Sequence, residues 1–115
     1  MTSSATIYHN PRCNTSRTVL KSIEEAGVVP RVIRYLEAPP TEGELRTLLA
    51  DAGLEPRQAI RTREGIYKEL GLAGADADTL IAAMIEHPIL IERPIVVTDK
   101  GTVLARPAET VQSVL

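Results

Sequence analysis

The chain has 115 residues, of which 43% are hydrophobic and 24% are charged, a composition typical of one small domain with a buried core. Its net charge of −2 argues against a protein that binds nucleic acid through a basic surface. The single cysteine, Cys13, excludes an internal disulfide, and together with two histidines it cannot complete a four-ligand structural zinc site.

The sequence shows no sign of membrane insertion or export. No segment approaches the roughly 18 consecutive apolar residues of a membrane helix. Residues 1–6 lead directly into a strand-like run, without the charged and apolar regions of a signal peptide. We therefore expect a cytoplasmic protein with no membrane or nucleic-acid partner and no bound metal or cofactor.

The first part of the chain predicts a β-α-β unit. A β-branched and aromatic run is typical of a strand, and apolar residues at helical spacing before a glycine are typical of a helix that ends there. In chain order we expect a strand over Ala5–His9, a helix that starts close to residues 13–15 and ends at Gly27, and a strand over Val32–Leu36.

The middle of the chain, about residues 41–88, predicts a helical insert. Three helices are expected there because each has a start or stop signal. They run from Thr41, which forms a capping-box pattern with Glu44, to Gly53; from Pro56 to about Arg63; and from Asp76 or Asp78 to Pro88.

The last part predicts a β-β-α unit. Ile95–Val97 is a short apolar strand, residues 98–101 form a turn, Val103–Ala105 is the hairpin partner, and Pro107 opens a final helix. A β-α-β unit needs a crossover between parallel strands, and the hairpin adds antiparallel ones. We therefore predict an α/β (α+β) fold in one domain over residues 1–115. Its mixed four-stranded sheet has the thioredoxin-like or glutaredoxin-like arrangement, with the helical insert between the two halves.

Cys13 is the strongest candidate for a reactive residue. It lies in the turn between the first strand and the first helix, where helix amides and dipole favour a thiolate. Arg12 and Arg17 add positive charge nearby, and Ser16 is placed to hydrogen-bond the sulfur. Because Ser16 also stands where a dithiol redox motif has its second cysteine, the sequence predicts a monothiol site. A phosphatase loop is excluded because Val19, and not arginine, lies six residues after the cysteine.

Several segments resemble the glutaredoxin-linked arsenate reductases of the thioredoxin-fold type. The likeness spans essentially the whole chain. It lies in residues 7–17 (IYHNPRCNTSR), 35–41 (YLEAPPT), 67–72 (YKELGL), 87–97 (HPILIERPIVV) and 106–107 (RP).

The resemblance implies a role for six residues. Cys13 would be the nucleophile, Arg61, Arg93 and Arg106 would bind the oxyanion substrate, and His9 and Ser16 would tune the thiol. Guanidinium groups suit this task because they neutralise oxyanion charge through paired hydrogen bonds. In thioredoxin-like folds the proline before the third strand is cis and faces the active-site cysteine, so we also expect a cis Arg93–Pro94 bond.

The function expected from these features is reduction of As(V) to As(III) through a Cys13 thio-arsenate intermediate. Glutathione, as co-substrate, and glutaredoxin would supply the electrons. Two alternatives stay open at this point. One is a monothiol thioredoxin-fold oxidoreductase that acts on glutathionylated substrates. The other is a regulator that binds RNA polymerase, although such regulators often carry a two-cysteine switch that Ser16 removes here.

Overall fold

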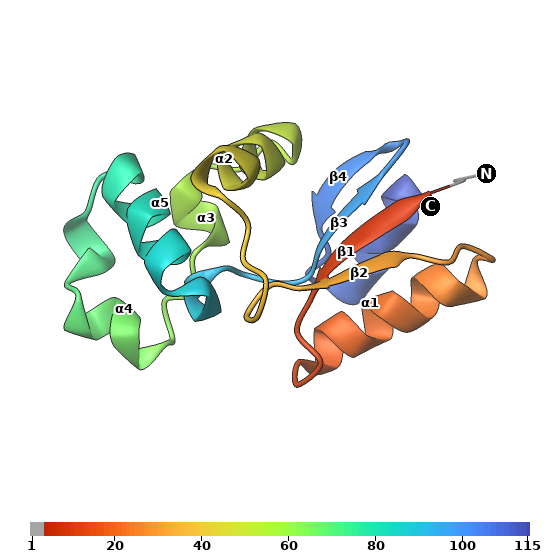
Figure 1. The fold of residues 1–115 in the computed structure, drawn as a ribbon, viewed down its shortest axis with the longest axis horizontal. Coiled ribbons are helices and arrows are strands. Elements are labelled where there is room, and N and C mark those ends of the chain that lie inside the picture. The colour runs from red at the N-terminus through yellow and green to blue at the C-terminus, as the bar shows by residue number, and fades with distance from the viewer. Residues whose placement is uncertain (1–3) are drawn as a thin grey trace. The chain divides into compact units, whose positions relative to one another are not determined.

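The computed structural model describes residues 4–115. Residues 1–3, which precede the first predicted strand, lie outside this range. The chain forms two compact units. Residues 4–38 and 93–115 form the first, here called the sheet unit, and residues 39–92 form the second, here called the helical unit. Figure 1 shows the chain leaving the sheet unit after its second strand and returning to it before the third.

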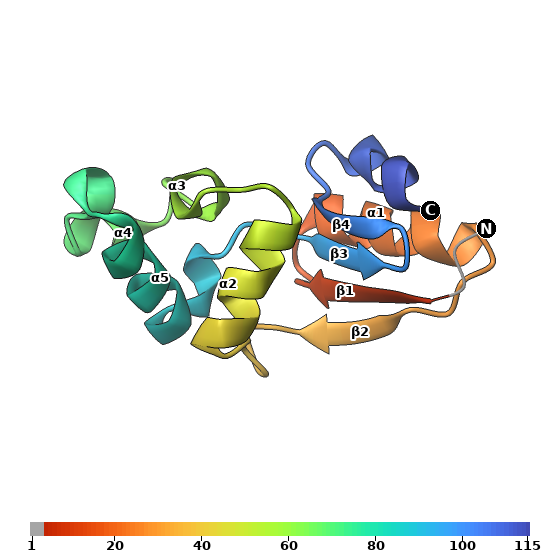
Figure 2. The same cartoon turned by 90° about the horizontal axis from the view of Figure 1, so that it is seen from above.

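The sheet unit is a four-stranded mixed sheet with the strand order β2-β1-β3-β4, as Figure 2 shows. The central strand β1 pairs in parallel with β2 and antiparallel with β3, and β3 pairs antiparallel with β4. The predicted mixed sheet is therefore confirmed. In chain order the elements are β1 (Ala5–His9), α1 (Asn14–Glu25), β2 (Arg31–Arg34), β3 (Ile95–Thr98), β4 (Gly101–Leu104) and the 3-10 helix η3 (Ala108–Val114).

The core of the sheet unit lies between the sheet and two helices. α1 and η3 contact each other, and both contact strands of the sheet. The apolar positions of α1 recur at helical spacing, so one face of the helix is buried against β1. The side chains that are fully buried in this core include Ile7, Val19, Ile23, Val96 and Val111.

Three elements of the sheet unit differ from the prediction. β4 spans Gly101–Leu104 instead of Val103–Ala105. β2 ends at Arg34 instead of Leu36, because the Arg34 carbonyl accepts hydrogen bonds from the N–H groups of Glu37 and Ala38 and the chain turns. The final helix is a 3-10 helix, with Pro107 just before it.

The helical unit contains α2 (Glu42–Asp51), α3 (Pro56–Ala59), α4 (Gly65–Glu69), η1 (Leu72–Gly74), α5 (Ala77–Glu86) and η2 (Pro88–Leu90). α5 is its central element because α2, α3 and η2 all contact it. The predicted capping box is present: the Glu44 N–H donates to Thr41 Oγ1, and the Thr41 N–H donates to the Glu44 carboxylate. Asp76 caps α5 by accepting the Thr79 N–H.

The helix predicted from Pro56 to Arg63 is shorter than expected. It ends at Ala59 because Ile60 is extended and forms an antiparallel bridge with Ile91. The sequence analysis also missed α4 and η1. Arg57 holds this region together, since its guanidinium donates to the Tyr67 hydroxyl and to the carbonyls of Leu72 and Ala75.

The two register partners Ile7 and Val32 provide a matched test of the core. Ile7 is 0% exposed, whereas Val32 is 42% exposed. We expect Ile7→Ala to lower the free energy of unfolding by about 2–5 kcal/mol, because it leaves a cavity. Val32→Ala should cost less than about 1 kcal/mol because it removes little buried surface. Urea unfolding of both variants measures this, and equal losses would contradict the difference in burial between the two side chains.

Candidate active site

The strand register brings three loops to the same edge of the sheet. Tyr8 of β1 pairs with Ile95 of β3, and Ile95 pairs with Leu104 of β4. The residues that follow β1, precede β3 and follow β4 therefore lie beside one another. These loops carry Cys13, Arg93 and Arg106, which are far apart in the sequence.

Asn10 organises the turn that presents Cys13. Its side-chain Oδ1 accepts the Arg12 N–H at 2.9 Å, and its carbonyl accepts the Cys13 N–H at 3.0 Å. The chain then enters α1, with Cys13 at the N-cap position. The thiol thus lies at the start of a 12-residue helix, where backbone N–H groups have no partner within the helix.

Two guanidinium groups reach the sulfur. Arg106 Nη1 lies 3.7 Å from Cys13 Sγ and also donates to the Arg93 carbonyl at 3.1 Å. The Arg93 guanidinium hydrogen-bonds the same sulfur. Its Nε and Nη1 atoms are buried, with no hydrogen-bond partner among residues 4–115. The peptide bond between Arg93 and Pro94 is cis, as predicted, and so is the bond between Arg106 and Pro107.

Competing effects set the pKa of Cys13. Burial raises it, but the Ser16 backbone N–H and the guanidinium groups of Arg93 and Arg106 lower it, and the net result is a pKa below that of an ordinary thiol. A lower pKa increases the thiolate fraction near neutral pH, and the thiolate is the nucleophilic form. The site therefore contains a cysteine whose thiolate form is favoured.

The cations that stabilise the thiolate are not those that the local sequence suggests. Arg12 and Arg17 were expected to do so, but the Arg17 guanidinium donates to the Pro11 carbonyl and to Asn14 Oδ1. The partners of the sulfur are instead Arg93 and Arg106, which the β1–β3–β4 pairing brings to it.

His9 and Ser16 form a buried polar pair beneath the turn. His9 Nδ1 and Ser16 Oγ are 2.6 Å apart, and Ser16 Oγ also accepts the Asn10 N–H at 3.1 Å. Burial, followed by the charges of Arg34 and Arg17, lowers the pKa of His9 and favours the neutral imidazole. Ser16 hydrogen-bonds the sulfur as expected, but it does so through its backbone N–H, because its hydroxyl serves His9 and Asn10.

Arg61 belongs to the helical unit, where it pairs with two carboxylates. Its Nε lies 3.0 Å from Glu64 Oε2, and its Nη1 lies 3.0 Å from Glu92 Oε2. The backbone holds this arrangement, because the Arg61 N–H donates to the Leu90 carbonyl and the Glu92 N–H to the Ala59 carbonyl. Burial lowers the pKa of Arg61, but the two carboxylates raise it above its ordinary value.

Comparison with known proteins agrees with this geometry. The sequence profile of the ArsC family matches residues 8–114, which is nearly the whole chain. The chain belongs to the ArsC family. An arsenate reductase from Yersinia enterocolitica is 54% identical to it over 115 residues, which cover 98% of this chain and 82% of the relative. One from Escherichia coli K12 is 51% identical, with the same coverage.

A solved structure extends the similarity to the fold. An arsenate reductase from Vibrio cholerae is 46% identical and superimposes with a TM-score of 0.93, with 100% of both chains covered. The predicted thioredoxin-like fold of the ArsC family is therefore confirmed.

The sheet unit of this ArsC-family protein has a pocket of about 250 Å³ next to the Cys13 turn. His9, Asn10, Pro11 and Arg12 line it from the end of β1 and the turn, and Arg34, Leu36 and Glu37 line it from the end of β2. Across residues 4–115 no helix is long and apolar enough to cross a membrane. The same range contains no group of three or more His, Cys, Asp or Glu side chains that could hold a metal ion.

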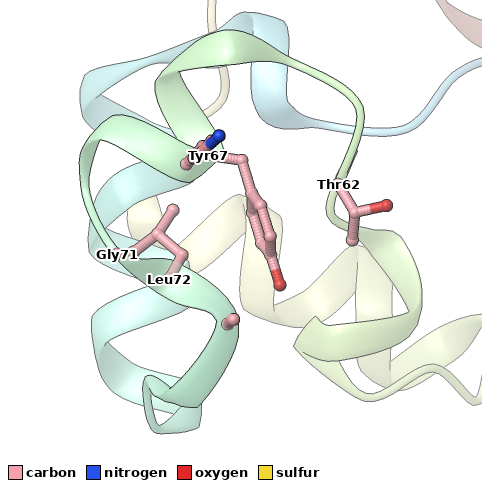
Figure 3. A pocket seen from close by; sticks show the side chains of 6 residues that line it. Thr62, Tyr67, Gly71 and Leu72 are labelled. Atoms are coloured by element: carbon pink, nitrogen blue, oxygen red, sulfur yellow. The ribbon is translucent and has the colours of Figure 1, made fainter.

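The helical unit has a separate pocket of about 310 Å³ around Tyr67. Figure 3 shows the Tyr67 ring lying between Thr62 and the segment that carries Gly71 and Leu72. None of the predicted site residues lines this pocket.

The pKa of the thiol can be measured from its alkylation rate as a function of pH. We expect the rate to saturate below the ordinary thiol pKa of about 8.5, because the thiolate is stabilised in the folded protein. Arg93→Gln should shift this midpoint upward by removing one stabilising cation. Arg31→Gln, which removes an exposed arginine of β2, is the control and should leave the midpoint in place. A midpoint at or above about 8.5 in the parent protein would contradict the activated thiol.

Proposed function

We propose that the protein is an arsenate reductase that uses Cys13 as its nucleophile and external thiols as its source of electrons. The observation that carries this proposal is the Cys13 sulfur in contact with two guanidinium groups. Such a site combines an activated thiolate with cations for an oxyanion that the thiolate must approach. Similarity to arsenate reductases over nearly the whole chain supports arsenate as that oxyanion.

Arg93 and Arg106 are the proposed arsenate ligands in the sheet unit. The two unpaired nitrogens of Arg93 are donors without an acceptor among residues 4–115, and an arsenate oxygen would satisfy them. Both cations also offset the repulsion between a thiolate and an arsenate anion. Arg61 is the third proposed ligand on the basis of the family resemblance, although its Nε and Nη1 already pair with carboxylates.

The first chemical step joins sulfur to arsenic. The Cys13 thiolate attacks As(V), an S–As bond forms, and an As–O bond breaks so that the oxygen leaves as water after it takes up a proton. The arginines stabilise the charge that develops on the oxygens during this step. The product is a Cys13 thio-arsenate in which arsenic is still pentavalent.

The second part of the reaction needs thiols that this chain does not contain, because Cys13 is its only cysteine. Glutathione forms a second S–As bond and a second water leaves. A glutaredoxin thiolate then attacks the glutathione sulfur and forms a mixed disulfide. The electron pair of the broken S–As bond stays on arsenic, which becomes As(III), and hydrolysis returns Cys13. In the cytoplasm, where we place the reaction, glutathione is the abundant thiol.

His9 and Ser16 are proposed as positioning residues. The Ser16 hydroxyl ties His9 and the Asn10 N–H together, and this holds the first turn of α1 so that the Ser16 backbone N–H stabilises the thiolate. A neutral His9 suits this role, because it adds no further cation under the turn.

Substitution of the arginines tests the oxyanion site. Arg93→Ala and Arg106→Ala should each lower kcat/KM for arsenate about 100- to 1000-fold, since loss of one preorganised donor commonly costs about 2.7–4 kcal/mol. Arg93→Lys should recover only part of the activity because an ammonium cannot make the planar paired contact. Arg31→Ala is the control because Arg31 is an exposed arginine of β2. Near-parental activity in both alanine variants would refute the site.

The electron source is tested by leaving out thiols one at a time. Turnover should require glutathione, glutaredoxin should accelerate it, and a thioredoxin system alone should support little, because a monothiol site cannot form the internal disulfide that thioredoxin reduces. A coupled NADPH assay measures these rates, and mass spectrometry should find any covalent adduct on Cys13. Multiple turnovers without any added thiol or glutaredoxin would overturn the mechanism.

A further inference from the structure

We propose that the pocket beside the Cys13 turn binds the electron-donating thiol through the carboxylate groups of a small acidic peptide such as glutathione. This inference rests on the proposed function, since it assigns a binding site to the second substrate of the same reaction. The proposal starts from the pocket between the Cys13 turn and the end of β2. The proposed reaction with arsenate gives this pocket no role.

The position of the pocket suits a molecule that must reach the thiol. One wall is formed by residues 10–12, and the next residue in the chain is Cys13 itself. Consecutive Cα atoms are about 3.8 Å apart, so the wall and the nucleophile belong to one short turn. The other wall is fixed by the sheet, because Arg34 is the register partner of His9 in the parallel β1–β2 pair.

The pocket carries two guanidinium groups that pair with no carboxylate among residues 4–115. Arg12 and Arg34 are exposed, and neither side chain has an ion pair or hydrogen bond within the part of the chain that the structure describes. Arginine pairs with carboxylates through two parallel N–H···O bonds. Glu37, which is also exposed and unpaired within residues 4–115, adds one negative charge.

This charge pattern is the complement of glutathione near neutral pH. That peptide has a carboxylate at each end and an ammonium group beside one of them, so two anions and one cation face two guanidinium groups and one carboxylate. His9 does not disturb this balance because its pKa is lowered and it is neutral. The half-exposed Leu36 offers an apolar contact to the peptide between its charged ends.

The volume of the pocket indicates that a bound peptide would be only partly enclosed. Pockets that bury most of a ligand commonly measure about 300–1,000 Å³. At about 250 Å³ this one is smaller, so the two charged ends of the peptide would contact its arginines while the sulfur stays outside. A thiol that must attack an arsenic atom on Cys13 needs this freedom.

Binding can be tested without any arsenate chemistry. S-methylglutathione carries the same charges as glutathione but cannot react, and its affinity is measured by calorimetry or by NMR titration. Arg34→Gln and Arg12→Gln should each weaken binding about tenfold, since a hydrogen bond between charged groups is commonly worth that factor. Arg34→Lys should recover part of the affinity. Arg31→Gln is the matched control because it is exposed on the same strand but does not line the pocket.

A kinetic experiment links binding to electron transfer. With saturating arsenate, Arg34→Gln should raise KM for glutathione about tenfold and leave the rate with 2-mercaptoethanol, a neutral thiol, within about twofold. With the diethyl ester of glutathione, in which both carboxylates are blocked, the parent protein and Arg34→Gln should have the same KM. The pH midpoint of Cys13 alkylation in Arg34→Gln should equal that of the parent, which separates loss of ligand binding from damage to the nucleophile.

The outcomes distinguish this proposal from the function on which it rests. If no thiol supports arsenate reduction, the proposed function fails, while S-methylglutathione binding still decides whether the pocket recognises the peptide. If the parent protein does not bind S-methylglutathione, or if Arg34→Gln and Arg31→Gln bind it equally, the pocket proposal is overturned even though arsenate is reduced. An equal loss of rate with glutathione and 2-mercaptoethanol in Arg34→Gln also overturns it.

Discussion

The position of the Cys13 sulfur against two guanidinium groups is the constraint on which the rest of the site depends. The contact between Arg106 and Cys13 joins residues 93 positions apart. Local sequence cannot create such a contact, and only the pairing of β3 with β1 on one side and with β4 on the other brings these loops together. The sheet pairing therefore sets the distance between the Cys13 thiol and the two guanidinium groups.

The surroundings of the thiol balance two opposing effects. Burial disfavours a charged sulfur, whereas a helix N–H and two cations favour it. Partial burial has a chemical use because electrostatic interactions are stronger where less water screens them. The neutral His9 and the shared Ser16 hydroxyl complete this arrangement, since they satisfy buried polar atoms without adding charge near the cations.

Much of the fold follows from short-range patterns in the sequence. Strand β1, helix α1, the capping box at Thr41 and a helix start at Asp76 or Asp78 were predicted because each depends on neighbouring residues. The early end of α3 was not, because it depends on the long-range bridge between Ile60 and Ile91. The same distinction applies to the site. Cys13 could be chosen from its turn, whereas Arg93 and Arg106 required a family resemblance because their meeting point is created by strand pairing. The role of Asn10 carried a weak signal, an asparagine just before a proline at a strand end.

The unpaired donors of Arg93 have a consequence for selectivity among anions. Guanidinium groups recognise charge and the directions of oxygen atoms, and phosphate offers nearly the same tetrahedron as arsenate. A site of this kind cannot reject phosphate strongly by binding alone, so phosphate should occupy it as a reversible competitor. Discrimination then falls to the chemical step, because thiols reduce pentavalent arsenic but not pentavalent phosphorus. The arsenate concentration needed for half-maximal turnover would therefore depend on the phosphate concentration in the cell as well as on the affinity of the site.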